Sequence, residues 1–309
     1  MTESRSSTES GRVPGASAYD RLLTKNGHML VVAADQRRSM LQLMPGVPAG
    51  ASEVARSRLL LSAKHALTDV LGVAAPAILL DWDSVMHHGV SPNLADTALV
   101  IGIDASEWNI NATTLLRESQ VVRGVDIAQA KKEGADAIKM LFYFRPDLEG
   151  PDSYPVNLME ELLADCNKAD ILLIFEILVY QAPNEDTQRY EDIRPDLIAQ
   201  SAEVARSLGA KVLKLQYPGS VEACHHVTQA ADGVPWALLS AGVTHDAFLL
   251  QVGNAIDGGA SGIMAGRALW GDCLVADDQL MRTRLSSLAV PRLSILECEM
   301  KKRSHESRP

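Results

Sequence analysis

Residues 210–218, with the sequence Ala-Lys-Val-Leu-Lys-Leu-Gln-Tyr-Pro, place Lys214 inside an apolar, strand-like run. A strand alternates its faces at every residue, so Lys214 shares one face with Val212 and Gln216. Burying an ammonium group there costs free energy unless the group is paired or becomes neutral. A neutral lysine is a nucleophile, so this run predicts a buried strand and suggests Schiff-base chemistry.

Apolar runs of this kind recur along the chain, and each is followed by a polar stretch that is compatible with a helix. The eight runs cover residues 29–35, 76–83, 97–103, 136–144, 171–180, 210–217, 235–241 and 260–267. Strands that alternate with helices imply parallel pairing, and nearly all-apolar strands are typical of a sheet covered on both faces. Eight such units fit a closed (β/α)₈ barrel, the TIM barrel of the α/β class.

A doubly wound open sheet is the alternative fold. It usually has fewer strands, and a glycine-rich phosphate loop follows its first strand. Residues 35–38, Asp-Gln-Arg-Arg, form no such loop. We therefore expect one barrel domain over residues 19–303, with disordered tails at 1–18 and 304–309. The expected helices cover residues 52–70, 125–133, 155–168, 187–208, 220–231, 246–258 and 288–303.

Composition excludes several classes of function. The chain has 309 residues, of which 47% are hydrophobic and 22% charged, as in an ordinary globular protein. A formal net charge of −10, without a basic run interleaved with aromatic residues, argues against a nucleic-acid partner. No stretch approaches the roughly 18 apolar residues of a membrane span, and residues 1–18 lack a signal-peptide core. We expect a cytoplasmic protein with no membrane partner.

The pattern of sulfur and imidazole ligands predicts no metal site. Four of the eight histidines form the adjacent pairs 87–88 and 225–226, which neither a strand nor a helix directs at one ion. Asp81 and Asp83 alone are weak support for a divalent cation. The cysteines are scattered without a CxxC pair and predict neither zinc nor a disulfide framework: Cys166, Cys224, Cys273 and Cys298.

Polar residues cluster near the C-terminal ends of the predicted strands, where a barrel has its active site. By alternation, Lys139 and Glu176 point into the barrel in the simplest register. One such group on most strands, all near one rim, indicates a functional site. In chain order the group comprises Asp35, Gln36, Asp81, Lys139, Glu176, Tyr180, Lys214, Gln216, Ser240, Ala241, Gly242, Gly266 and Arg267.

Two lysines and a glutamate in this set suggest a mechanism. Neighbouring lysines disfavour each other's protonation, so we expect a neutral amine that lets Lys214 attack a ketone. The iminium that forms is an electron sink for breaking a carbon–carbon bond, and Glu176 can shuttle protons. The alternative is a buried ion network of Lys139, Glu176 and Lys214 without catalysis.

The ends of the seventh and eighth runs suggest a phosphate site. Loops after these strands of a barrel commonly bind phosphate through glycine N–H groups and the start of a short helix. Ser240 and Gly242 follow the seventh run, and Gly266 precedes Arg267, whose guanidinium can bind an oxyanion with two donors. The glycines could instead be turn residues. Residues 104–123 are polar and read as an irregular loop, either a specificity lid or a solvated connection.

The motifs around these residues resemble the class I aldolases that include tagatose 1,6-bisphosphate aldolase and sulfofructose phosphate aldolase. The similarity covers about residues 25–302, and its motifs occur in the family's order. They are Ala-Ala-Asp-Gln-Arg at 33–37, Glu-Gly-Ala-Asp-Ala-Ile-Lys at 133–139, Phe-Glu-Ile-Leu-Val-Tyr at 175–180, Val-Leu-Lys-Leu at 212–215, Leu-Ser-Ala-Gly-Val at 239–243 and Ala-Gly-Arg-Ala-Leu-Trp at 265–270.

The resemblance implies a role for each residue of the site. Lys214 would form the Schiff base, Glu176 would be the acid/base, and Lys139 and Asp35 would assist. No metal or other cofactor is implied. Ser240, Gly242, Gly266 and Arg267 would bind the phosphate of the dihydroxyacetone-phosphate half. The predicted substrate-binding set also includes Gln36, Arg37, Asp81, Tyr180 and Ala241.

We therefore expect a lyase that reversibly cleaves a ketohexose 1-phosphate with an anionic group at carbon six, and that assembles as a homo-oligomer. Tagatose 1,6-bisphosphate is the favoured substrate, and 6-deoxy-6-sulfofructose 1-phosphate is the alternative. A non-catalytic sugar-phosphate-binding barrel and a metal-free isomerase or epimerase remain rivals. The candidate donors for the carbon-six anion are Arg37, Arg38, Arg117, Arg123 and Arg145.

Overall fold

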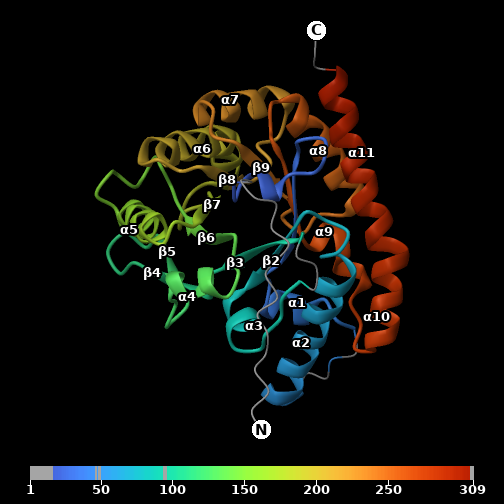
Figure 1. Cartoon of the computed structure of the whole chain (residues 1–309). Coiled ribbons are helices and arrows are strands. Elements are labelled where there is room, and N and C mark those ends of the chain that lie inside the picture. The colour runs from blue at the N-terminus through green and yellow to red at the C-terminus, as the bar shows by residue number, and fades with distance from the viewer. Residues whose placement is uncertain (1–16, 46, 48–49, 93–95, 307–309) are drawn as a thin grey trace.

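The structure is a computed structural model that describes residues 17–306, except residues 46, 48–49 and 93–95. Eight parallel strands close into a barrel, in the spatial order β1-β10-β9-β8-β7-β6-β3-β2 (Figure 1). This confirms the predicted (β/α)₈ TIM barrel. The barrel strands are β1 (Met29–Ala34), β2 (Ala77–Asp81), β3 (Ala98–Gly102), β6 (Ala137–Tyr143), β7 (Leu172–Leu178), β8 (Val212–Leu215), β9 (Trp236–Leu239) and β10 (Gly262–Ala265).

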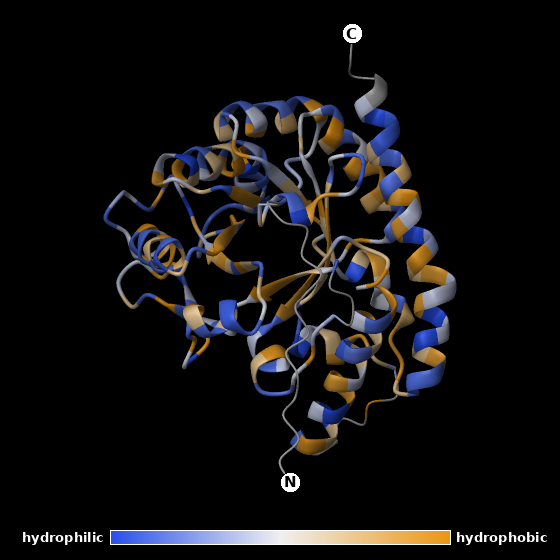
Figure 2. Cartoon of the chain, viewed as in Figure 1, coloured by the Kyte–Doolittle hydropathy of each residue, from blue (hydrophilic) through white to orange (hydrophobic). Residues whose placement is uncertain are grey.

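Alternation along the strands divides the apolar residues into two layers. One layer fills the barrel interior and includes Val31, Leu79 and Met264. The larger layer lies between the barrel and the surrounding helices and includes Val32 and Ile263. Figure 2 shows apolar strands at the centre and helices with mixed polar and apolar faces around them. Strands buried on both faces explain the nearly continuous apolar runs in the sequence.

The helices that cover the barrel mostly begin at polar residues that accept a backbone N–H bond. Ser52, Asp186 and Thr244 do so at three of them, and each such cap satisfies a donor that the first turn leaves free. The main helices are α2 (Glu53–Val70), α4 (Ile127–Lys132), α5 (Tyr154–Lys168), α6 (Thr187–Leu208), α7 (Val221–Ala231), α8 (His245–Asp257), α10 (Asp278–Arg284) and α11 (Val290–Glu306).

Shorter elements join these. They are the 3₁₀ turns η1 (Asp20–Leu22) and η2 (Gly271–Cys273), the short helices α1 (Arg38–Gln42), α3 (Trp82–Met86) and α9 (Arg267–Trp270), and the π-helical turn η3 (Leu285–Ala289). Residues 1–16 and 307–309 of the predicted tails lie outside the described residues. α11 continues to Glu306, so residues 304–306 are helical rather than part of a tail.

The segment 104–123 folds as a β-hairpin, and the prediction of an irregular loop was wrong. β4 (Asp104–Ile110) pairs antiparallel with β5 (Arg117–Val121). Asn111 stabilises the turn, because its Oδ1 accepts the N–H groups of Thr113 and Thr114 at 2.9 and 3.0 Å. Because an isolated hairpin is marginal in water, its stability depends on contacts with the barrel that no local pattern reveals.

Among the described residues, no helix combines the length and the apolar character that crossing a membrane requires.

Candidate active site

A cavity of about 820 Å³ opens at the carboxyl ends of the barrel strands. Residues of six barrel strands line it: β1, β6, β7, β8, β9 and β10. The loop that joins β1 to α1, residues of α1 and the first half of β4 complete the lining. The volume is in the range of small-molecule sites, and this end of a barrel is where its enzymes bind substrates. The predicted residues Lys139, Glu176 and Lys214 all line the cavity.

Strand alternation carries these three residues into the barrel interior. Ala137, Ile174 and Val212 belong to the interior apolar layer, and each charged residue lies two positions farther along the same strand. Glu176 and Lys214 are direct partners in the register of β7 and β8. The sequence-based orientation of Lys139 and Glu176 is therefore confirmed.

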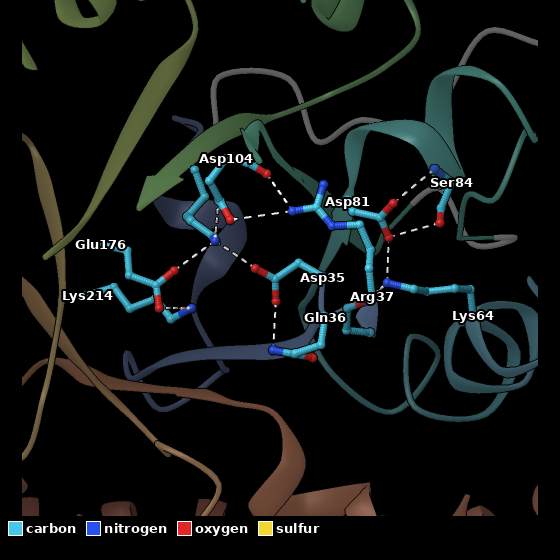
Figure 3. Close-up of polar contacts among 11 residues, drawn as sticks. Asp35, Gln36, Arg37, Lys64, Asp81, Ser84, Asp104, Glu176 and Lys214 are labelled. Carbon is cyan, nitrogen blue, oxygen red and sulfur yellow. Dashed lines mark hydrogen bonds and ion pairs between the residues drawn. The ribbon is translucent and has the colours of Figure 1, made fainter. Parts of the chain in front are cut away.

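Lys139 lies at the centre of a buried charge cluster, whose carboxylates Asp35, Asp104 and Glu176 are labelled in Figure 3. Its Nζ lies 2.6 Å from Asp35 Oδ2, 2.6 Å from Asp104 Oδ1 and 2.7 Å from Glu176 Oε2. The side chain of Lys139 is 1% exposed. A buried ammonium is tolerated when its partners compensate for the lost hydration, and three carboxylates do so here.

Glu176 connects Lys139 to Lys214. Its second oxygen, Oε1, lies 2.8 Å from Lys214 Nζ (Figure 3). Lys214 is almost completely buried, yet it lines the cavity. A carboxylate within hydrogen-bond distance of an amine can exchange a proton with it without a conformational change.

The charge states of this cluster follow from its geometry. Burial alone would lower the pKa of Lys139, but the three carboxylates outweigh burial and raise the pKa well above its ordinary value. Burial would raise the pKa of Glu176, but Lys139 and Lys214 lower it below the usual range, and the pKa of Asp35 falls for the same reason. The two lysines were expected to disfavour each other's protonation. This expectation is wrong for Lys139, because the carboxylates around it raise its pKa and keep it charged.

The loop after β1 completes one side of the cavity. Gln36 donates from Nε2 to Asp35 Oδ1 at 2.9 Å, and its buried Oε1 has no hydrogen-bond partner among the described residues. Arg37 donates to the main-chain oxygen of Asp104 at 2.5 Å. All three side chains that the sequence predicts here, Asp35, Gln36 and Arg37, line the cavity.

Asp104 is a site residue that the sequence analysis did not single out. It is the first residue of β4, and it contacts both Lys139 and Arg37. The available signal was an acidic residue just past the third apolar run, at the rim where strand ends meet. Reading residues 104–123 as one polar loop concealed that signal.

The ends of β9 and β10 form the opposite side of the cavity. The Gly266 N–H donates to Ser240 Oγ at 3.2 Å, which ties the two strand ends together. Gly242 has a φ of +78°, and a Cβ there would lie 3.1 Å from Arg267 Cζ, so the guanidinium packs against bare backbone. Ser240, Ala241, Gly266 and Arg267 line the cavity, whereas Gly242, which packs against Arg267, does not.

Two other predicted substrate-binding residues lie outside the cavity lining. Asp81 caps α3, so its carboxylate turns toward Ser84 and lies 2.5 Å from the buried Nζ of Lys64 (Figure 3). Tyr180 accepts the N–H of Arg117 at 2.8 Å through its hydroxyl. Both polar groups are thus engaged by the protein itself. Across the described part of the chain, no group of three His, Cys, Asp or Glu residues is arranged to hold a metal ion.

Comparison with known proteins shows the family of the chain. The model of the family described as "DeoC/LacD family aldolase" matches residues 29–272. A tagatose 1,6-diphosphate aldolase 1 of Streptococcus pyogenes is 27% identical over 82% of this chain and 83% of its own length. A tagatose 1,6-diphosphate aldolase of Listeria monocytogenes is 26% identical over 82% of this chain and 80% of its own.

Solved structures share the fold. An archaeal fructose 1,6-bisphosphate aldolase superposes with a TM-score of 0.59 at 19% identity, covering 88% of this chain and 98% of that one. A fructose-bisphosphate aldolase from Slackia heliotrinireducens gives a TM-score of 0.61 at 17% identity, covering 91% and 90%. At these identities the structural likeness supports the barrel alone. The family match over most of the sequence decides the identity: the chain belongs to the DeoC/LacD family of aldolases and is a lyase.

Proposed function

We propose that the protein is a class I aldolase in which Lys214 forms a Schiff base with a ketose phosphate. The observation that carries the proposal is the contact of Lys214 Nζ with Glu176 Oε1 at 2.8 Å, inside a cavity lined by further polar groups. Lys139 contacts the other oxygen of the same carboxylate and holds it ionised. A nucleophilic amine beside a charged base is what iminium formation requires.

The proposed reaction uses the cluster in order. Glu176 takes a proton from Lys214, whose neutral amine adds to the ketone carbon and forms a carbinolamine. Glu176 then protonates the departing hydroxyl, and loss of water leaves the iminium. Glu176, ionised again, takes the proton of the carbon-four hydroxyl, and the bond between carbons three and four breaks. Its electrons pass into the iminium, and carbons four to six leave as the aldehyde. The resulting enamine is protonated at carbon three and hydrolysed, which releases dihydroxyacetone phosphate. Proton transfer of this kind contributes about 10²–10⁴-fold.

The proposed substrate is a ketohexose 1-phosphate with an anionic group at carbon six. Ser240, Ala241, Gly266 and Arg267 supply hydroxyl, main-chain and guanidinium donors for the carbon-one phosphate. The relatives in Streptococcus and Listeria are named tagatose 1,6-diphosphate aldolases, so tagatose 1,6-bisphosphate is the first substrate to assay. Such phosphorylated sugars are charged metabolites of the cytoplasm, where we also place the enzyme.

Borohydride trapping tests the proposal. Incubation with dihydroxyacetone phosphate and borohydride should reduce the iminium to a stable adduct, and peptide mass mapping should find that adduct on Lys214. The variant Lys214→Met should give no adduct. The matched control is Lys211→Met, which removes an exposed lysine three residues away and should label normally. An adduct on a different lysine would show that another amine is the nucleophile, and no adduct in the wild type would favour a non-catalytic barrel or an isomerase.

A further inference from the structure

Lys64 is a buried cation that the proposed reaction does not use. It lies on α2, outside the cavity lining, and its side chain is 0% exposed. Its Nζ donates to Asp81 Oδ1 at 2.5 Å (Figure 3) and to the main-chain oxygen of Ala34. A buried ammonium is costly even when it is paired, and apolar residues often stabilise such a position equally well or better. Stability alone is therefore a weak reason for a lysine here.

Both acceptors of Lys64 lie at the carboxyl ends of neighbouring strands. Ala34 is the last residue of β1, and Asp81 is the last residue of β2. The pairing of these two strands ends at Ala34 and Leu80, and α3 begins directly after Asp81. Lys64 thus joins the ends of β1 and β2 at the point where their own pairing stops.

The end of β1 matters because Asp35 follows it directly. Asp35 lines the cavity, and its Oδ2 lies 2.6 Å from Lys139 Nζ. The carbonyl that Lys64 holds belongs to the planar peptide unit that joins β1 to Asp35, so fixing this carbonyl also fixes the backbone from which the carboxylate extends. One residue earlier, Trp270 Nε1 donates to the main-chain oxygen of Ala33 at 3.0 Å. Side chains from α2 and α9 therefore hold the last two carbonyls of β1.

The charge of Lys64 acts in the same direction as its contact. Burial would raise the pKa of Asp35, but Lys139 and Lys214 lower it, and the positive charge of Lys64 adds to their effect. Asp81 supplies the opposite charge beside Lys64, while its other oxygen accepts the N–H that begins α3. The carboxylate at the end of β2 thus serves the buried lysine instead of the cavity.

We propose that Lys64 is a positioning residue of the active site, with Asp81 as its counter-ion. Lys64 holds the carbonyl at the end of β1 and thereby keeps the Asp35 carboxylate against Lys139. The inference rests on the proposed aldolase function, because Lys139 contacts the carboxylate that exchanges protons with Lys214. Loss of the Lys64 contact should slow the chemical steps and leave the proposed phosphate-binding side, at the ends of β9 and β10, unchanged.

The double variant Lys64→Met/Asp81→Asn tests the proposal. It removes both charges together, so no unpaired charge stays buried, and an asparagine can still cap α3. We expect a folded protein whose kcat for tagatose 1,6-bisphosphate is about tenfold lower and whose KM changes less than about twofold. Borohydride trapping of dihydroxyacetone phosphate on Lys214 should slow by a similar factor.

Thr68→Val is the matched control on the same helix. Thr68 is buried one turn after Lys64, and its hydroxyl donates to the main-chain oxygen of Lys64 at 2.7 Å. The variant alters α2 but leaves the Lys64 side chain and its contact with Ala34 in place. Its kcat should therefore stay within about twofold of the wild-type value, even where its Tm changes.

A double-mutant cycle with Asp35→Asn shows whether Lys64 acts through Asp35. The change Lys64→Met/Asp81→Asn should lower kcat about tenfold in the wild type and less than about twofold in the Asp35→Asn background. Multiplicative losses would mean that Lys64 acts by another route and would overturn the assignment. If the double variant does not fold, Lys64→Gln gives the same test, because it leaves Asp81 a neutral donor but ends one bond short of the lysine amine.

The remaining outcomes separate this inference from the proposed function. A double variant that folds and cleaves with wild-type kcat overturns the inference and leaves a purely structural ion pair. An equal loss of kcat in Thr68→Val does so too, because it would show that any disturbance of α2 has this effect. Failure of the wild type both to cleave the substrate and to trap dihydroxyacetone phosphate overturns the proposed function together with the inference.

Discussion

At the scale of single residues, Lys139 controls the charge of the site. It contacts Asp35, Asp104 and Glu176. Without its positive charge these buried carboxylates would lose the one cation that they share, although Lys214 would still contact Glu176 and Arg37 would still lie near Asp104. Removing one partner from a buried ion cluster is costly because the others remain buried and charged. Lys139 is therefore needed both for folding and for keeping Glu176 ionised beside Lys214.

Lys139→Met should lower the free energy of unfolding by about 3–5 kcal/mol at pH 7 and abolish aldol cleavage. The pH dependence has a definite sign. Wild-type Asp35 and Glu176 have lowered pKa values, so their contribution to stability is present above their unfolded values of about 4 and is lost as the pH falls through the folded values. The difference in unfolding free energy between the wild type and Lys139→Met should thus be largest at pH 7 and should decrease below about pH 4. Urea unfolding at several pH values measures it, with Lys211→Met as the exposed control. A gap that does not change with pH would contradict this account.

Sequence reasoning succeeded for side chains whose direction is a local property. A period of two places Lys139, Glu176 and Lys214 on the inner face of their strands, whatever the rest of the chain does. It failed for Asp81, because a helix begins there and the cap turns the carboxylate away from the cavity. Asp104 was missed for a related reason: its direction depends on a hairpin whose existence is decided by tertiary contacts.

At the scale of elements, the β4–β5 hairpin forms the wall of the cavity that the barrel strands do not supply. It brings Asp104 to Lys139 and Trp108 to the cavity, where the indole packs edge-on against Tyr143 at 5.0 Å. Arg117 lies among three aromatic rings and holds the hairpin in place. Its turn lacks the Asn-Gly or Asp-Gly pair that marks a two-residue hairpin, so the sequence gives little local sign of it.

Arg117→Ala should loosen this hairpin, because it removes contacts worth about 0.5–2 kcal/mol. Tryptophan fluorescence reports the change at one site: Trp82, Trp236 and Trp270 are at most 3% exposed, whereas Trp108 is 41% exposed. We expect stronger quenching of the emission by acrylamide in Arg117→Ala than in the wild type. The control Arg123→Ala, an exposed arginine just past β5, should quench like the wild type. The double variant Arg117→Ala/Trp108→Phe should be quenched like Trp108→Phe alone. Equal quenching of Arg117→Ala and the wild type would mean that other contacts hold the hairpin.

At the scale of the whole molecule, the barrel is complete only when its last strand pairs with its first. The strands and their order follow from local apolar runs and from the rule that consecutive βα units lie side by side, which is why the fold could be predicted. Closure is a different matter, since β1 and β10 are more than two hundred residues apart in the chain. The backbone geometry at that seam cannot be predicted from either strand alone.

Gly262, the first residue of β10, is where closure restricts the sequence most. It pairs with Met29 in the register of the two strands, its φ is +152°, and a Cβ there would lie 2.0 Å from the Met29 carbonyl oxygen. The atoms that this Cβ would meet belong to the backbone of Met29, so they cannot move aside unless β1 and β10 separate. Gly262→Ala should therefore lower stability by about 3 kcal/mol or more, which corresponds to a fall in Tm of about 5–10 °C. Gly150→Ala is the matched control, since Gly150 is exposed and a Cβ there meets no atom within 4 Å. A Gly262→Ala protein that melts within about 1 °C of the wild type would show that the seam can relax, and that closure does not depend on a bare backbone at this position.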